Sequence, residues 1–262
     1  MSLTFPENES EKRKHIEDLM AEWKCLVKHD HFVRDGFYPY YWNQPIRLLV
    51  IGREGRGLTN RDHTDKDYID VLLNDGYWVS KIGGRQINTL PFQRRLMKVV
   101  YGIVKGFPAF KEVPDAATIG RMVAKENGIS FAWMNLSKES NNDDKNWQTN
   151  ATIFNRSFNE SMKAGLIGKE IELLSPQVII SMNEGGRVKE VLEKVADVAP
   201  RNNPPKWIKG AYDVTFKNLE NSGKAIWLDT YHFAAHNTRY IKVNDEDSFY
   251  NPICSMLKGD MI

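Results

Sequence analysis

The stretch Arg47–Gly57, RLLVIGREGRG, is the part of the chain around which the fold is interpreted. Its first five residues, Arg47–Ile51, have the apolar character of a buried strand, and a segment with glycines at Gly52, Gly55 and Gly57 follows them. Charged residues separate these glycines. Open α/β sheets bind ligands at the carboxyl ends of their strands. We therefore expect a strand here that opens into a loop forming the floor of a functional site.

The length and composition favour one globular domain. We expect a single domain over residues 1–262, with residues 1–45 as a helical and aromatic-rich lead-in. Hydrophobic residues make up 41% and charged residues 27%, which is ordinary for a protein with a packed core. Because 36 Lys+Arg balance 34 Asp+Glu, the chain lacks the strongly basic character of a protein that coats DNA non-specifically. The composition is nevertheless compatible with a local basic groove.

Cysteine usage and the absence of long apolar segments bear on the compartment. Cys25 and Cys254 are too few for a four-cysteine zinc or iron–sulfur site, and we expect two free thiols. The opening residues contain no apolar signal-peptide core, and no window approaches the roughly 18 apolar residues of a membrane span. We expect a cytoplasmic protein without a membrane partner. Association with the nucleoid is equally compatible with the sequence. The sequence does not give the oligomeric state.

Hydrophobic spacing predicts helices that alternate with strands. Helices are expected at residues 10–33, 68–73, 92–104, 115–125, 155–174, 186–195 and 248–257. Strands are expected at residues 47–51, 129–134, 177–182, 212–216 and 225–228. An aromatic-rich packing segment at 34–44 and a long surface loop at 136–150 complete the pattern. This alternation predicts an α/β protein, a three-layer α/β/α sandwich around a mostly parallel sheet.

Polar segments follow four of the expected strands, and they lie at Gly52, Asn135, Asn183 and His232. On a parallel sheet these segments would converge at one edge. Glu54 would bring an acid or water-orienting group, Asn135 an amide that donates and accepts, and His232 an imidazole that stabilises an anion. Taken singly, each has a structural alternative: a loop cap for Glu54, a turn residue for Asn135 and a buried histidine for His232.

Spacing argues against several other chemistries. GREGRG has the pattern G-x-x-G-x-G, which is not the dinucleotide fingerprint, and no Gly-Lys-Ser/Thr of a P-loop follows it. The chain has no G-x-S-x-G nucleophile elbow. His232 and His236 are four residues apart, but HFAAH lacks the glutamate of the zinc-protease motif. We expect neither a metal nor another cofactor.

In order and context, these segments resemble the motifs of the uracil-DNA glycosylase superfamily. VIGREGRG resembles the first motif, with Glu54 where several branches hold a water-orienting acid or amide. FAWMNLS matches the second motif at Asn135, the family's base-binding asparagine. SPQVIISMNEGG resembles the strand before a glycine turn, and HFAAHN resembles the last motif at His232 and Asn237. The resemblance covers residues 47–239.

The resemblance implies a DNA-repair hydrolase that flips uracil or a related damaged base and cleaves its N-glycosidic bond without a cofactor. DNA, single- or double-stranded, would be the partner. His232 would stabilise the departing base as an anion, and Glu54 would orient or deprotonate water. Gly52, Arg53 and Gly55 would belong to the substrate-binding loop.

The implied base-binding residues are Asn135 and Asn237, with Tyr68 stacking on the base. Tyr77 and Trp78 are rival stacking residues.

Two departures from the family pattern keep other functions open. The first motif lacks the family's proline, and Phe233 and Ala234 replace a Pro-Ser pair after the histidine. One alternative is therefore a catalytically silent glycosylase-like protein that binds nucleic acid or a nucleotide. The other is an unrelated small-molecule hydrolase that shares these residues at its strand ends.

Overall fold

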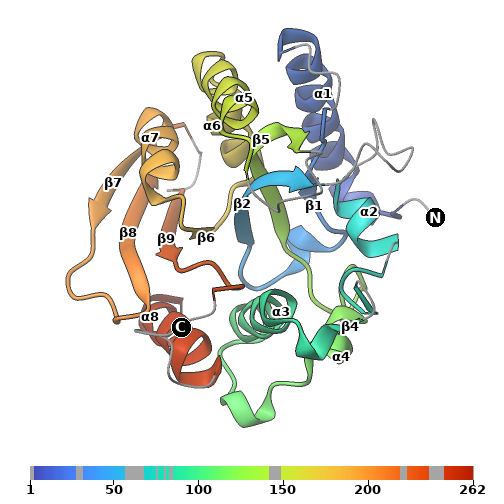
Figure 1. Cartoon of the computed structure of the whole chain (residues 1–262), viewed down its shortest axis with the longest axis vertical. Coiled ribbons are helices and arrows are strands. Elements are labelled where there is room, and N and C mark those ends of the chain that lie inside the picture. The colour runs from blue at the N-terminus through green and yellow to red at the C-terminus, as the bar shows by residue number, and fades with distance from the viewer. Residues whose placement is uncertain are drawn as a thin grey trace.

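The computed structural model of the chain describes residues 3–27, 32–56, 68–74, 76–79, 81–82, 85–141, 149–218, 223–235 and 245–261. It has one seven-stranded sheet with helices on both faces (Figure 1). The sheet strands are β1 (Gly36–Phe37), β2 (Leu48–Arg56), β5 (Ala132–Asn141), β6 (Val178–Met182), β7 (Ala196–Pro200), β8 (Ile208–Phe216) and β9 (Lys224–Thr230). A separate two-stranded hairpin pairs β3 (Lys81–Ile82) with β4 (Arg85–Gln86).

The helices lie where apolar spacing predicts most of them. They are α1 (Ser10–Val27), α2 (Tyr68–Asn74), α3 (Pro91–Val104), α4 (Ala116–Gly120), α5 (Ala151–Lys163), α6 (Leu166–Leu174), α7 (Gly185–Val195) and α8 (Asn251–Met261). Short turns of helix are η1 (Glu7–Glu9), η2 (Tyr41–Asn43), η3 (Ile87–Thr89), η4 (Phe110–Glu112) and the π-turn η5 (Glu246–Tyr250). Asp115 caps α4, because its carboxylate accepts hydrogen bonds from the backbone N–H groups of Ala117 and Thr118.

The sheet is mixed, with the order β1-β5-β2-β6-β9-β8-β7. Its four central strands, β5, β2, β6 and β9, run parallel to one another. The outer pairings β1–β5, β8–β9 and β7–β8 are antiparallel. The α/β prediction is confirmed, but the sheet is less parallel than expected, because β8 and β7 return beside β9 as a meander. The parallel centre brings the carboxyl ends of four strands to one edge of the sheet.

Side-chain alternation along β2 divides the core into two halves. Leu48 and Val50 belong to a cluster with side chains of α3, α4 and α8, and we call this side the α3 face. Leu49 and Ile51 belong to a cluster with side chains of α1, α5, α6 and α7, which we call the α5 face. Figure 1 shows these two groups of helices on opposite sides of the sheet. Because both faces are covered, Leu48–Ile51 of β2 and Ala132–Met134 of β5 are apolar runs without polar alternation.

Two strands are longer than expected, and both extensions concern the site. β2 does not end at Ile51 but continues through the predicted glycine loop to Arg56, which pairs with Asn141 of β5. β5 likewise continues past Asn135, so residues 136–141 form buried strand where a surface loop was expected. The prediction failed because the polar side chains of this extension are buried together with hydrogen-bond and ion-pair partners. Lys138, for example, is fully buried against two carboxylates.

Other boundaries also differ from the sequence-based expectations. Helix α1 ends at Val27, and Phe32 forms an antiparallel bridge with Glu139. The predicted helix 155–174 is two helices, because Gly165 takes a positive φ of 73° between them. Strand β7 was not expected. Both cysteines are free thiols, as predicted.

In the part of the chain that the structure describes, no helix is both long enough and apolar enough to cross a membrane.

Candidate functional site

Gly52 and Asn135 are register partners on the parallel strands β2 and β5. A Cβ atom added to Gly52 would lie 2.7 Å from Asn135 Oδ1 and 3.1 Å from Trp133 Cζ2. The glycine therefore makes room for the Asn135 side chain to lie over β2. Gly52 is required for this close approach and not for a turn, since its backbone is ordinary strand.

The Asn135 side chain is a buried amide with an unused donor. The residue is 1% exposed, and its Oδ1 accepts a long hydrogen bond of 3.4 Å from Trp133 Nε1. Among the described residues, Asn135 Nδ2 has no hydrogen-bond partner. Its backbone N–H donates to Asp35 Oδ2 at 2.5 Å, which fixes the strand at this point. An unpaired buried donor costs about 1–3 kcal/mol, and such a group in a native fold is a candidate ligand contact.

Two aromatic contacts connect Asn135 with the segment that follows β9. Trp133, the hydrogen-bond donor to Asn135, has its ring 6.3 Å from that of Phe92 in an edge-on arrangement. Phe92, in the first turn of α3, stacks on the His232 imidazole with ring centroids 5.3 Å apart and planes inclined by 24°. The structure thus brings Asn135 and His232 to the same face of the sheet, joined through side chains of β5 and α3.

The hydrogen bond to the His232 ring fixes its tautomer. Nδ1 accepts from the backbone N–H of Ala234 at 3.1 Å, and an accepting ring nitrogen carries no proton. In the neutral imidazole the proton therefore sits on Nε2, which makes Nε2 a donor. The residue is exposed and follows the carboxyl end of β9, at the edge of the sheet where a ligand would bind.

Arg95 of α3 anchors the backbone of the segment that contains His232. Its Nη1 donates to two backbone carbonyls, that of Phe233 at 2.7 Å and that of Ala235 at 3.0 Å. Its Nε donates to Asp245 Oδ1 at 2.8 Å, and the guanidinium lies 4.4 Å from the centre of the Phe249 ring. Arg95 is therefore a buried anchor for the backbone next to His232.

Asp245 strengthens this anchor. Its carboxylate also accepts from Arg94 Nε at 2.5 Å, so two neighbouring arginines share it. Burial raises the pKa of Asp245, but the hydrogen bonds and charges of Arg94 and Arg95 outweigh burial and hold the pKa below its ordinary value. The carboxylate is therefore ionised throughout the neutral range, and the anchor keeps its charge there.

Glu54 lies on β2 two residues beyond Gly52, and strand alternation puts both on the α3 face. The residue is 9% exposed, and its Oε1 accepts a hydrogen bond from Asn141 Nδ2 at 3.2 Å. Its register partner is Ser137, two residues after Asn135 on β5. The predicted acid is thus on the same face as the predicted base-binding amide, inside a paired strand and oriented by Asn141.

Arg53 points to the opposite side of the sheet. It forms an ion pair with Glu184, at the start of α7, and its Nη1 donates to Thr149 Oγ1 at 3.2 Å. Gly55, the next predicted substrate-binding residue, is buried within β2. Of the predicted substrate-binding loop, Gly52 therefore touches Asn135, while Arg53 serves the α5 face.

Trp78, a rival for stacking on a base, is a core residue. It is 1% exposed and donates from Nε1 to Tyr38 Oη at 2.7 Å. Tyr77 packs edge-on against it at 4.8 Å. Tyr68 is the first residue of α2, and the position of its side chain lies outside the description, as do Asn237 and His236 altogether. The roles predicted for Tyr68 and Asn237 stay predictions.

Asp229, a buried carboxylate at the end of β9, supports α7. Its Oδ1 accepts from Ser181 Oγ at 2.7 Å, and the Gly185 backbone approaches it closely enough that a Cβ there would lie 2.5 Å from Oδ2. Burial raises the pKa of Asp229. The sequence analysis gave Asp229 no role, although its position three residues before His232, at the end of an expected strand, was a usable signal.

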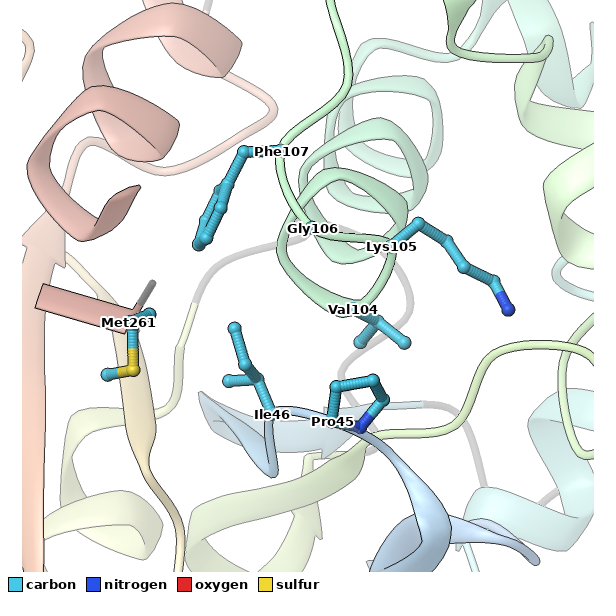
Figure 2. Close-up of a pocket in the computed structure, with 7 residues that line it drawn as sticks. All are labelled: Pro45, Ile46, Val104, Lys105, Gly106, Phe107 and Met261. Atoms are coloured by element: carbon cyan, nitrogen blue, oxygen red, sulfur yellow. The ribbon is translucent and has the colours of Figure 1, made fainter. Parts of the chain in front are cut away.

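Two surface hollows lie away from this edge. One, of about 370 Å³, opens beside the residues that precede β2 and therefore at the amino end of the strand (Figure 2). Its lining residues are Pro45, Ile46, Val104, Lys105, Gly106, Phe107 and Met261. The other, of about 510 Å³, lies between the β7–β8 connection and α8. Neither contains a residue predicted for the site.

Comparison with known proteins gives no assignment: no protein-family model matches the chain, and a search of curated proteins finds no match. Within the described residues, no group of three His, Cys, Asp or Glu side chains is arranged to hold a metal ion. The function is therefore inferred from the geometry of the site itself.

Sequence reasoning missed three supporting residues: Trp133, Phe92 and Arg95. Trp133 could have been found, because residues two apart on a strand share a face and Trp133 precedes Asn135 by two. Phe92 and Arg95 carried no local signal, since their contacts are with a segment about 140 residues later in the chain.

Proposed function

We propose that the α3 face at the carboxyl edge of the sheet binds a nucleobase extruded from DNA, and that the protein hydrolyses the N-glycosidic bond of uracil or a related damaged base. The observation that carries this proposal is the buried Asn135 amide, whose Nδ2 has no partner among the described residues. The resemblance of four ordered motifs to the uracil-DNA glycosylase superfamily supports it. So does the covering of the sheet by helices on both faces, which fits a three-layer α/β/α sandwich of that type.

The residues divide the chemistry between them. Asn135 Nδ2 would donate to a carbonyl oxygen of the base, and Oδ1, backed by Trp133, would accept from a ring N–H. Cleavage leaves an anionic base and an oxocarbenium-like sugar. The Nε2–H of His232 would donate to that anion, and Glu54, oriented by Asn141, would direct water to the sugar. None of these steps calls for a metal.

Release of free base from oligonucleotides tests the proposal. Single- and double-stranded substrates carrying uracil, hypoxanthine or xanthine are incubated with the wild-type protein and with Asn135→Ala and His232→Ala. We expect free base from at least one wild-type reaction and none above background from either variant. Matched controls are Asn218→Ala and His15→Ala, which change exposed residues elsewhere and should retain activity. Intact oligonucleotide in every wild-type reaction would overturn the proposal.

A second candidate function is nucleic-acid binding without cleavage. The hydrogen bond from Asn141 to Glu54 favours this alternative. The Glu54 carboxylate is buried within a strand, so water reaches it less easily than it would reach a carboxylate in an open loop. Under this alternative, the wild-type protein binds uracil-containing strands in a salt-dependent way but releases no base, and Asn135→Ala weakens the preference for uracil.

A further inference from the structure

On the α5 face, two arginines share one buried carboxylate. Glu184 lies between β6 and α7 with its side chain 1% exposed. Arg53 of β2 contacts Oε1 through Nε and Nη2, and Arg187 of α7 contacts Oε2 through Nη1 at 2.9 Å. Each carboxylate oxygen thus pairs with one guanidinium, and the two arginines come from different elements, β2 and α7.

An aromatic ring and two polar side chains complete the arrangement. The Phe154 ring lies under both guanidiniums, with its centre 4.7 Å from Arg187 Cζ and 6.0 Å from Arg53 Cζ. Arg53 Nη1 donates to Thr149 Oγ1, and Arg187 Nη2 lies 3.4 Å from Asn155 Oδ1. Because three neighbouring side chains position each of the two arginines, little rotamer entropy remains to be lost when an anion binds.

The arrangement keeps a positive charge at the surface. Two guanidiniums against one carboxylate leave a net charge of +1, and the arginine side chains are 43% and 40% exposed. Helix α5 also begins here with the Asn150 cap, so the positive end of its dipole adds to the field. A single arginine would suffice to neutralise Glu184, so the second is in excess of what the buried carboxylate requires.

We propose that Arg53 and Arg187 form a phosphate clamp for a nucleic-acid strand. Planar guanidinium forks fit phosphate oxygens in a bidentate way, and Glu184 with Phe154 would hold both forks in advance. Arg53 lies between Gly52 and Glu54 on β2 but on the other face, so a phosphate in the clamp sits across the sheet edge from the nucleobase site. The choice of nucleic acid as the ligand rests on the proposed function; the clamp geometry does not.

Salt-dependent binding of a fluorescent single-stranded oligonucleotide without a damaged base tests the clamp. We expect Arg187→Gln and Arg53→Gln to bind more weakly than wild type. Each should also lower the slope of log K against log salt by about 0.7, the contribution of one phosphate contact on a single strand. The control is Arg121→Gln, which removes an exposed arginine beside α4, near the amino end of β5. Unchanged affinity and slope in both clamp variants would overturn the proposal.

Folding is controlled with Arg53→Lys and Arg187→Lys, which keep Glu184 paired with a charge while removing the fork. We expect both to melt close to wild type and to bind with affinities between wild type and the glutamine variants. A binding loss seen only in glutamine variants that have also lost their folded structure would count against the clamp.

The same assay separates this proposal from the proposed function. Asn135→Ala should bind the undamaged strand like wild type even though it releases no base. If the wild-type protein releases no base from any substrate while the clamp variants still lose binding, the proposed function fails and the clamp stands. If the protein binds inorganic phosphate at the clamp but no oligonucleotide, the assignment to nucleic acid is overturned.

Discussion

The two faces of the sheet at its carboxyl edge have opposite chemistry, although alternate residues of one strand supply both. On the α3 face, Gly52 makes room for Asn135, which joins Trp133 and, through aromatic contacts, His232. On the α5 face, Arg53 joins Glu184 and the side chains around it in an ion-paired cluster. One face therefore presents an amide, an imidazole, aromatic rings and the Glu54 carboxylate, and the other presents anchored positive charge.

The difference shows how one edge can recognise two parts of one ligand. A nucleobase is flat and neutral and is read by hydrogen bonds and stacking, whereas its backbone is a chain of charges. Side chains at successive strand positions point to opposite faces, so the stretch Gly52-Arg53-Glu54 serves both. On this view, changes on the α3 face should affect chemistry and changes on the α5 face should affect affinity.

The largest effect is expected from removing the amide on the α3 face. Asn135→Ala should lower the rate of base release by about 10²–10³-fold, the usual cost of one positioned donor. Single-turnover kinetics at saturating oligonucleotide measures this without interference from binding. Asn135→Asp keeps the size but replaces the donor with an acceptor, and it should be equally slow. A fast Asp variant would show that shape, and not donation, is what Asn135 provides.

The next effect concerns the anchor of the His232 segment. Arg95→Leu removes hydrogen bonds to two carbonyls and leaves Asp245 with less compensation, so we expect a loss of about 3 kcal/mol in the free energy of unfolding. Urea denaturation measures it. Arg94→Leu is the matched control, since Arg94 also binds Asp245 but is more exposed, and it should cost clearly less. Equal losses would contradict the assignment of Arg95 as the anchor.

A smaller effect tests the contact between β2 and β5. Gly52→Ala puts a methyl group 2.7 Å from Asn135 Oδ1 and should cost about 1–3 kcal/mol of stability through overpacking. Gly186→Ala, in the first turn of α7 with open space around its Cβ position, should be neutral or slightly stabilising. Thermal unfolding compares the two. A neutral Gly52→Ala would show that Asn135 does not lie over β2.

The smallest effect concerns a buried charge beneath the α5 face. Lys138 pairs with Asp35 and Glu170, all three side chains are fully buried, and burial raises the pKa of Glu170 well above its ordinary value. The folded state therefore binds a proton that the unfolded state releases above its ordinary pKa of 4.5. This contribution to stability is complete below that pKa and declines as the pH rises toward the folded pKa.

Glu170→Gln removes this titration, so its stability relative to wild type should increase as the pH rises from 4.5 through the neutral range. Denaturation at a series of pH values measures the difference. A difference that is constant over this range would mean that Glu170 stays ionised in the fold.

The sequence was sufficient for the apolar parts of the fold and for the order of the site residues along the chain. Strand β6 and helix α3 were predicted nearly to the residue because apolar spacing alone defines them. The extensions of β2 and β5 were not predictable, since their polar residues are satisfied by distant partners. Lys138 is one example, bound to Asp35 about 100 residues earlier in the chain.

The candidate site could be predicted in part. Asn135 and His232 were identified by residue type and by their positions after apolar strands, and the structure brings them to one face. That Arg53 belongs to the other face follows from strand alternation once β2 is known to continue, but a loop was expected there. The contact of Phe92 with His232 depends on how α3 packs, which local sequence does not encode.

The central claim is that Asn135 Nδ2 contacts the base, and NMR of the side-chain amide tests it most directly. The ¹⁵N-labelled protein is titrated with a single strand carrying 2′-fluoro-deoxyuridine, whose glycosidic bond resists cleavage. Asn135→Ala identifies the signal, and the same strand with thymine in place of uracil is the control. We predict that the Asn135 NH₂ signals shift on addition of the uracil strand and not with the control. Unmoved Asn135 signals, with the strand bound as judged by other shifted resonances, would contradict the account.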